Sequence, residues 1–172
     1  MIRLAMALAC GLVGAGIVHI VTVLSAPALA ERTAFDRVGE LGGEGAFAPF
    51  PQPDPHLEAR VCRFPLERPV RIAGEGAVPF WSASVLSREG TNLYSLNDRT
   101  ATGGTLDLVV ARRDDLTALR EGLGQQATEL VPVNADAAMV IVRSFVPDET
   151  RSAEAGRFLS TLSCEAFEPS GS

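Results

Sequence analysis

The chain has 172 residues, with 15 basic and 21 acidic side chains and a formal net charge of −6 at pH 7. This acidic balance supplies no basic face for nucleic acid, so we expect no nucleic-acid partner. All the basic residues are arginine, which excludes a Schiff-base lysine and a P-loop. Only two histidines occur, so a histidine-based metal site is not expected. We expect no cofactor.

Residues 1–30 predict a transmembrane anchor. After Arg3, no formally charged side chain occurs from Leu4 to Ala30. As a helix this stretch would be about 40 Å long, enough to cross a hydrocarbon core of about 30 Å with some tilt. Ala28-Leu29-Ala30 also fits an A-x-A cleavage pattern, so a signal peptide is the alternative.

The charges that flank this segment predict its orientation. The amino terminus and Arg3 precede it, whereas charges of both signs follow it. The positive-inside rule therefore favours a cytoplasmic N-terminus. We expect a protein of the inner (cytoplasmic) membrane whose domain lies in the periplasm or another extracytoplasmic space.

Residues 31–58 predict a Gly- and Pro-rich connector. Prolines occupy alternate positions from Pro49 to Pro55. Because each proline fixes φ, this spacing favours an extended, semi-rigid spacer that holds the domain away from the bilayer. A Pro-rich ligand for another protein is the alternative.

Two cysteines mark the ends of the expected exported domain, residues 59–165. Cys10 lies in the apolar segment, which leaves Cys62 and Cys164. In an exported compartment such a pair predicts a disulfide, with two buried free thiols as the alternative. No C-x-x-C motif occurs, so a redox-catalytic role is not expected.

Residues 81–98 predict a β-hairpin, because apolar and polar side chains alternate on both sides of Glu89-Gly90. A two-residue turn there fixes the pairs, whereas a three-residue turn with a bulge would shift the register by one. The core-side pairs would be Trp81 with Asp98, Ala83 with Leu96 and Val85 with Tyr94; the partly solvated pairs would be Ser82 with Asn97, Ser84 with Ser95 and Leu86 with Leu93.

The remaining patterns predict an α+β fold. Five more strand-like runs and two amphipathic helices, within residues 114–124 and 147–164, accompany the hairpin. We expect a mainly antiparallel β-sheet or sandwich of about six to eight strands with two helices, preceded by one N-terminal transmembrane helix. Residues 166–172 are expected to form a loose tail.

Short motifs follow one another along most of the chain: His19-Ile20, Val61-Cys62-Arg63-Phe64, Trp81-Ser82-x-Ser84-Val85, Gly90-x-Asn92-x-Tyr94-x-x-Asn97-Asp98-Arg99, Gly104-x-Leu106-Asp107-Leu108, Ile141-Val142-Arg143 and Cys164. The series resembles an uncharacterised bacterial family of membrane-anchored domains, related to the first domain of larger two-domain β-rich proteins. The resemblance implies a partner protein that carries the second β-rich domain. The family has no established reaction, so it implies no catalytic residue.

A candidate polar cluster centres on Arg143, which interrupts an apolar strand. A buried charge needs a partner, which Asp98 or Asp107 could provide. The structural interpretation is a buried Arg–Asp pair that fixes sheet register. The functional interpretations are a pocket for an anionic or sugar-like ligand, or acid–base catalysis by Asp98. The cluster comprises Trp81, Asn97, Asp98, Arg99, Asp107 and Arg143.

Two functional hypotheses remain from the sequence. The first is a non-catalytic exported module, tethered by its N-terminal helix, that binds a partner protein or an envelope component. The second is an envelope hydrolase with its site near Asp98 and Arg143.

Overall fold

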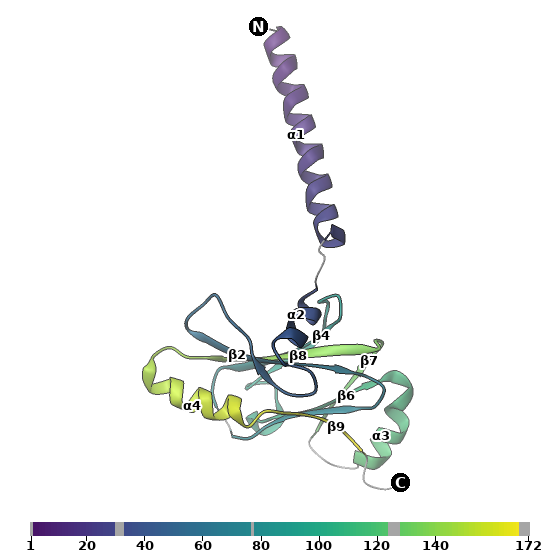
Figure 1. Ribbon diagram of the computed structural model, residues 1–172, viewed down its shortest axis with the longest axis vertical. Coiled ribbons are helices and arrows are strands. Elements are labelled where there is room, and N and C mark those ends of the chain that lie inside the picture. Colours follow the sequence, from purple (N-terminus) through teal and green to yellow (C-terminus); the bar gives the residue numbers. More distant parts are fainter. Residues whose placement is uncertain (1, 30–32, 77, 124–127, 169–172) are drawn as a thin grey trace. The chain divides into compact units, whose positions relative to one another are not determined.

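The chain divides into two compact units, Met1–Arg32 and Thr33–Ser172. The computed structural model describes residues 2–29, 33–76, 78–123 and 128–168 (Figure 1). The expected cleavage position after Ala30 and the end of the expected tail, residues 169–172, lie outside the described residues.

The first unit is one apolar helix, α1 (Ile2–Leu29). Over Ile2–Ala26 it is long and apolar enough to cross a membrane, a property that a signal sequence shares. The Thr22 hydroxyl donates to the Val18 carbonyl at 2.9 Å, so this polar group is paired inside the helix, as an apolar environment requires.

The second unit is a sandwich of two β-sheets with short helices, so the predicted α+β class is confirmed. The five-stranded sheet is antiparallel, in the order β1-β2-β8-β4-β5. The four-stranded sheet has the order β7-β6-β3-β9, with β6 and β7 parallel. The strands are β1 (Ala48–Pro49), β2 (Leu57–Pro65), β3 (Val70–Gly74), β4 (Trp81–Ser87), β5 (Asn92–Asn97), β6 (Leu106–Arg112), β7 (Glu129–Val133), β8 (Ala137–Phe145) and β9 (Ser163–Ala166). The helices are α2 (Ala34–Glu40), α3 (Leu116–Leu123) and α4 (Glu149–Ser160), with 3₁₀ turns at Thr102–Gly104 and Arg113–Asp115.

The number of strands is slightly higher than expected. The described residues form nine strands, against the six to eight predicted. The two short strands β1 and β9 account for the excess, because each has too few residues to show a period-2 pattern in the sequence.

Inward-facing apolar side chains of both sheets form the main core. In β4, Trp81, Ala83 and Val85 are buried and the residues between them are not, because successive strand residues face opposite ways. The disulfide between Cys62 of β2 and Cys164 of β9 joins the two sheets across this core. The predicted pairing of these cysteines is therefore present in the structure.

The predicted hairpin is formed by β4 and β5, and most of its register is confirmed. Ser82 pairs with Asn97, and the following pairs agree as far as Val85 with Tyr94. A bulge then shifts the register, so that Leu86 lies opposite Asn92 instead of Leu93.

The segment after Thr33 packs on the domain, which differs from the extended spacer expected over residues 31–58. Helix α2 buries Phe35 and Val38 against β2 and β8, on the outer face of the five-stranded sheet. Further along, β1 pairs with β2 at the edge of this sheet, where the missing N–H of Pro49 is tolerated.

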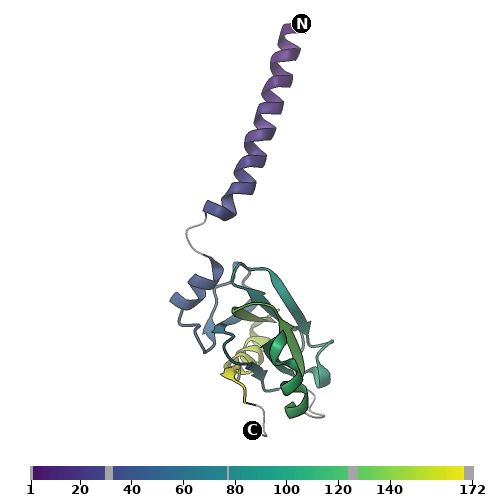
Figure 2. The ribbon, with the colours of Figure 1, turned by 90° about the vertical axis from the view of Figure 1, so that its right-hand side faces the viewer.

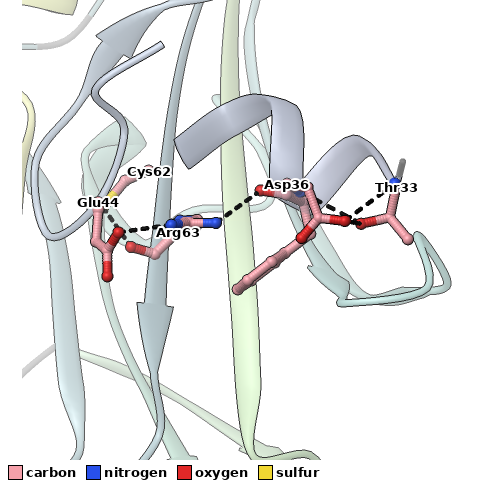
Figure 3. A network of polar contacts seen from close by, with 6 residues as sticks. Thr33, Asp36, Glu44, Cys62 and Arg63 are labelled. Carbon is pink, nitrogen blue, oxygen red and sulfur yellow. Dashed lines mark hydrogen bonds and ion pairs between the residues drawn. The ribbon is translucent and has the colours of Figure 1, made fainter. Parts of the chain in front are cut away.

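Arg63 of β2 fastens this segment to the sheet (Figure 3). Its guanidinium donates to the Glu44 carboxylate at 2.6 Å and to the Phe35 carbonyl at 3.3 Å. Thr33 and Asp36 form a capping box at the start of α2, and the hydrogen bonds from Thr33 lower the pKa of Asp36. The second compact unit of the chain therefore includes this segment from Thr33 onward.

Helices α3 and α4 lie at opposite ends of the domain in Figure 1, and in Figure 2 the domain is seen from the end where α3 lies. Phe158 of α4 packs on the Trp81 ring at 5.9 Å between centroids. Leu119 of α3 packs against the outer face of the four-stranded sheet together with Phe167. Because Phe167 also donates its backbone N–H to the Pro69 carbonyl at 2.7 Å, the described start of the expected tail is part of the fold.

Candidate binding surface

The six predicted site residues lie in three different places. Trp81 is buried in the core, and its indole N–H donates to the Gly104 carbonyl at 3.2 Å. Asp107 lies on the outer face of the four-stranded sheet, whereas Arg143 lies on the outer face of the five-stranded sheet. The core of the sandwich separates the last two residues, so the predicted cluster is not one site.

Asp107 is fully occupied within its own sheet. Arg71 of β3 donates from Nε and Nη2 to its two carboxylate oxygens, both at 2.8 Å, and the Thr128 hydroxyl adds a third hydrogen bond at 3.0 Å. The hydrogen bonds to Asp107 raise the pKa of Arg71 above its ordinary value. Asp107 therefore fixes the pairing of β3 with β6 and is no partner for Arg143.

Asn97, Asp98 and Arg99 form the turn after the hairpin. The Asn97 Oδ1 accepts hydrogen bonds from the backbone N–H groups of Arg99 and Thr100, at 3.0 and 3.1 Å, as in an Asx turn. The Asp98 Oδ2 accepts from the backbone N–H of Phe80 at 3.0 Å. The Arg99 side chain is exposed. The amide oxygen of Asn97 and the carboxylate of Asp98 thus stabilise the backbone conformation of this turn.

Arg143 is half-buried and has no hydrogen bond or ion pair to any described residue. Burial lowers the pKa of its guanidinium below the ordinary value. The predicted Arg143–Asp98 or Arg143–Asp107 pair was wrong, because the first carboxylate holds Phe80 and the second lies on the other sheet. Within the part of the chain that the structure describes, Arg143 is a cation without a counterion on a sheet face.

Polar side chains extend from Arg143 across two neighbouring strands. Arg143 lies opposite Ser82 of β4, and Ser82 lies opposite Asn97 of β5, so all three face outward in one row. The next row contains Ser84 and Ser95, whose hydroxyls are 3.1 Å apart and hydrogen-bonded. We call this set, together with the adjacent Phe80, the Arg143 surface: Phe80, Ser82, Ser84, Ser95, Asn97 and Arg143.

Phe80 has an unusual backbone conformation. Its φ is +63°, and it is the one residue other than glycine with a positive φ among those described. The Asp98 carboxylate accepts from its N–H, and its carbonyl accepts from the N–H of Phe145 at 3.0 Å. The Phe80 ring is 58% exposed and meets the Phe145 ring edge-on at 6.4 Å. The surrounding hydrogen bonds therefore hold a strained residue with its ring toward solvent.

Sequence reasoning identified Arg143 and Asn97 but missed the rest of this surface. The alternating serines of β4 were a usable signal, because their outward face was predicted correctly. Phe80 gave no signal, since nothing in the sequence distinguishes a phenylalanine with positive φ from a strand residue. Among the residues that the structure describes, no group of three or more His, Cys, Asp or Glu side chains could hold a metal ion.

The chain matches no protein-family model and no curated protein. It is similar to a solved structure of the VPA0106 protein from Vibrio parahaemolyticus, with a TM-score of 0.60 and 11% identity, over 72% of this chain and 30% of that chain. An uncharacterised protein from Burkholderia cenocepacia gives a TM-score of 0.44 and 15% identity, over 77% of this chain and 38% of that one. The first similarity shows the fold alone, and the chain spans less than a third of that protein's length.

Proposed function

We propose that the chain is a membrane-anchored module whose exported β-sandwich binds another component of the cell envelope through the Arg143 surface, without a reaction of its own. In this proposal the N-terminus lies in the cytoplasm and the domain in the periplasm or another extracytoplasmic space. The observation that carries the proposal is the half-buried guanidinium of Arg143, which lacks a partner among the described residues.

Two features support the location. Helix α1 has the length and composition of a membrane span. The domain behind it contains the Cys62–Cys164 disulfide, and such bonds persist mainly in oxidising compartments outside the cytoplasm. The positive-inside rule agrees with this orientation, because Arg3 and the amino terminus precede the helix.

Three features support binding. An unpaired, partly desolvated guanidinium gains a large share of its missing interaction energy when a ligand supplies an anion. The neighbouring serine hydroxyls and the amide N–H group of Asn97 offer further hydrogen-bonding groups on the same face of the sheet. The exposed Phe80 ring, held at positive φ, adds apolar area, and strained residues of this kind cluster at binding sites.

Two other expectations stay proposals. A partner protein carrying a second β-rich domain rests on the resemblance described above, and the similarity to part of a longer protein is compatible with it. The alternative function, an envelope hydrolase near Asp98 and Arg143, is less well supported, because the Asp98 carboxylate holds the Phe80 backbone.

Co-sedimentation with envelope fragments tests the proposed function. The full-length chain in detergent micelles is mixed with washed envelope fragments, and the bound fraction is measured for the wild type, Arg143→Gln and Arg113→Gln. Arg113 is exposed next to the four-stranded sheet, so its variant makes the same charge change elsewhere. We expect Arg143→Gln to weaken binding about tenfold and Arg113→Gln to leave it unchanged; equal binding by all three would refute the proposal.

A further inference from the structure

We propose that the ligand of the Arg143 surface is a glycan chain that carries isolated carboxylates between neutral sugars. The inference rests on the proposed function and names the chemical class that this surface would take. It depends on three parts of the surface, namely the cation, the row of small polar side chains and the exposed ring.

The cation selects a carboxylate. A guanidinium presents parallel N–H donors that match the two oxygens of a carboxylate, as Arg71 and Asp107 demonstrate within this domain at 2.8 Å. Arg143 has the same donors and no acceptor among the described residues. Its register partners on the two neighbouring strands are Ala59 and Ser82, whose small side chains leave room for an incoming carboxylate.

The polar row favours sugars over a protein. Each serine hydroxyl can both donate and accept, and so can a sugar hydroxyl. Ser84 and Ser95 are already hydrogen-bonded to each other, and the Asn92 amide donates to Ser95 at 2.9 Å, so the row is ordered before a ligand arrives. Protein–protein interfaces are depleted in serine, whereas the two rows of the Arg143 surface contain three serines, Ser82, Ser84 and Ser95.

The ring of Phe80 supplies a stacking platform at the end of the polar row. The face of an aromatic ring carries negative potential, which suits the weakly positive C–H face of a pyranose. Phe145 meets Phe80 edge-on, and the hydrogen bonds of the Phe80 backbone to Asp98 and Phe145 fix its place. A sugar stacked on Phe80 would thus place its neighbours over Ser82 and Arg143.

The negative net charge of the protein limits how many carboxylates the proposed glycan can carry. The chain carries −6, and its soluble part, with 14 arginines against 21 acidic residues, carries −7. A dense polyanion would be repelled by this field before it reached a single arginine. A chain with one carboxylate in every few sugars avoids most of this repulsion and still provides the acceptor that Arg143 needs.

Matched oligosaccharides test the inference. Titration calorimetry of the full-length chain in detergent micelles compares an octasaccharide of alternating N-acetylglucosamine and glucuronic acid with a neutral N-acetylglucosamine oligomer of equal length. We expect the uronate form to bind at least about tenfold more tightly, and Arg143→Gln to remove that preference. Phe80→Gly should weaken both ligands, and Arg113→Gln neither. Thermal melts of each variant establish that it is folded, and Arg143→Lys, which keeps the charge, should retain part of the preference.

Several outcomes would overturn the inference. Equal affinity for the two oligosaccharides, or no binding of either, would do so, and so would tighter binding of a glutamate-rich peptide than of the uronate octasaccharide. If the oligosaccharides fail while Arg143→Gln still abolishes co-sedimentation with envelope fragments, the glycan is wrong and the proposed function stands. If Arg143→Gln changes neither measurement, both proposals fall.

Discussion

Arg71 and Asp107 form a bidentate ion pair across β3 and β6, with both N···O distances at 2.8 Å. The pair lies on the outer face of the four-stranded sheet, and the Thr128 hydroxyl donates a further hydrogen bond to the same carboxylate. Arg143, on the outer face of the other sheet, has no equivalent partner among the described residues. Arg71 therefore joins two strands, whereas Arg143 has no partner among the described residues, and this difference is the basis of the proposed binding role.

Replacing Arg143 by methionine should leave stability almost unchanged. Since no hydrogen bond or ion pair to a described residue is lost and methionine keeps most of the apolar stem, we expect a change within about 0.5 kcal/mol in the free energy of unfolding, measured by chemical denaturation. Arg71→Met is the matched comparison. This variant leaves the Asp107 carboxylate without its ion-pair partner and should lower the free energy of unfolding by up to about 1 kcal/mol. The value is small because the Arg71 side chain is 42% exposed. A loss above 2 kcal/mol for Arg143→Met would assign Arg143 to the structure instead.

Removing the disulfide should destabilise the domain strongly. Cys62 and Cys164 are 102 residues apart and connect the two sheets, so the double alanine variant should lose about 2–5 kcal/mol of folding free energy. Cys10→Ala is the control, because Cys10 is a free cysteine in α1. Mass spectrometry of the protein with and without reductant should find the Cys62–Cys164 peptide pair, and free thiols at both positions would contradict this disulfide.

Two glycine substitutions test whether the segment after Thr33 is docked on the sheet. A Cβ at Gly43 would lie 2.8 Å from a Val38 methyl and 3.0 Å from the carbonyl oxygens of Val38 and Val61, so Gly43→Ala should destabilise the domain. Gly156 lies in α4, and beyond its chain neighbours and the backbone of its own helix nothing lies within 4 Å of the added Cβ, so Gly156→Ala should stabilise by about 0.5–1 kcal/mol. Thermal melts compare the two, and an unaffected Gly43→Ala would mean that this segment is not packed.

Asp148 should make stability depend on pH in the acid range. Its carboxylate caps α4 through the Thr150 hydroxyl and the backbone N–H groups of Thr150 and Arg151, and these hydrogen bonds lower its pKa in the folded state. A depressed folded pKa stabilises the fold above the unfolded pKa, near 4, and this contribution is lost as the pH falls through the folded value. Asp148→Asn, which keeps an acceptor oxygen, should be less stable at pH 7 and should show a shallower decline below pH 4; an identical pH profile would contradict this role.

The parts of the structure that the sequence predicted are those with local, repeated signals. The alternation of Trp81, Ala83 and Val85 with serines sets both faces of β4, and it led to the correct partners in β5. The shift at Leu86 was missed because a bulge depends on how the turn closes. Helix α2 was missed because two buried side chains, Phe35 and Val38, are too few to produce a helical period.

The candidate site depended on information that the sequence does not contain. Asp107 and Arg143 both lie in strands, and only the assignment of β6 and β8 to different sheets shows that they face away from each other. The positive φ of Phe80 arises from its hydrogen bonds to Asp98 and Phe145, which are distant in the chain. Both features come from tertiary pairing, so residue patterns alone could not indicate them.

Photocrosslinking in living cells tests directly whether the Arg143 surface binds another molecule. Ser95 is exposed on the Arg143 surface, and replacing it with p-benzoylphenylalanine places a photoreactive group there; the same replacement at Arg113 provides the control. We expect a crosslinked species from Ser95 that disappears with Arg143→Gln and is absent from the Arg113 position. The same crosslinks from both positions, or a Ser95 crosslink that persists in Arg143→Gln, would contradict a binding role for this face.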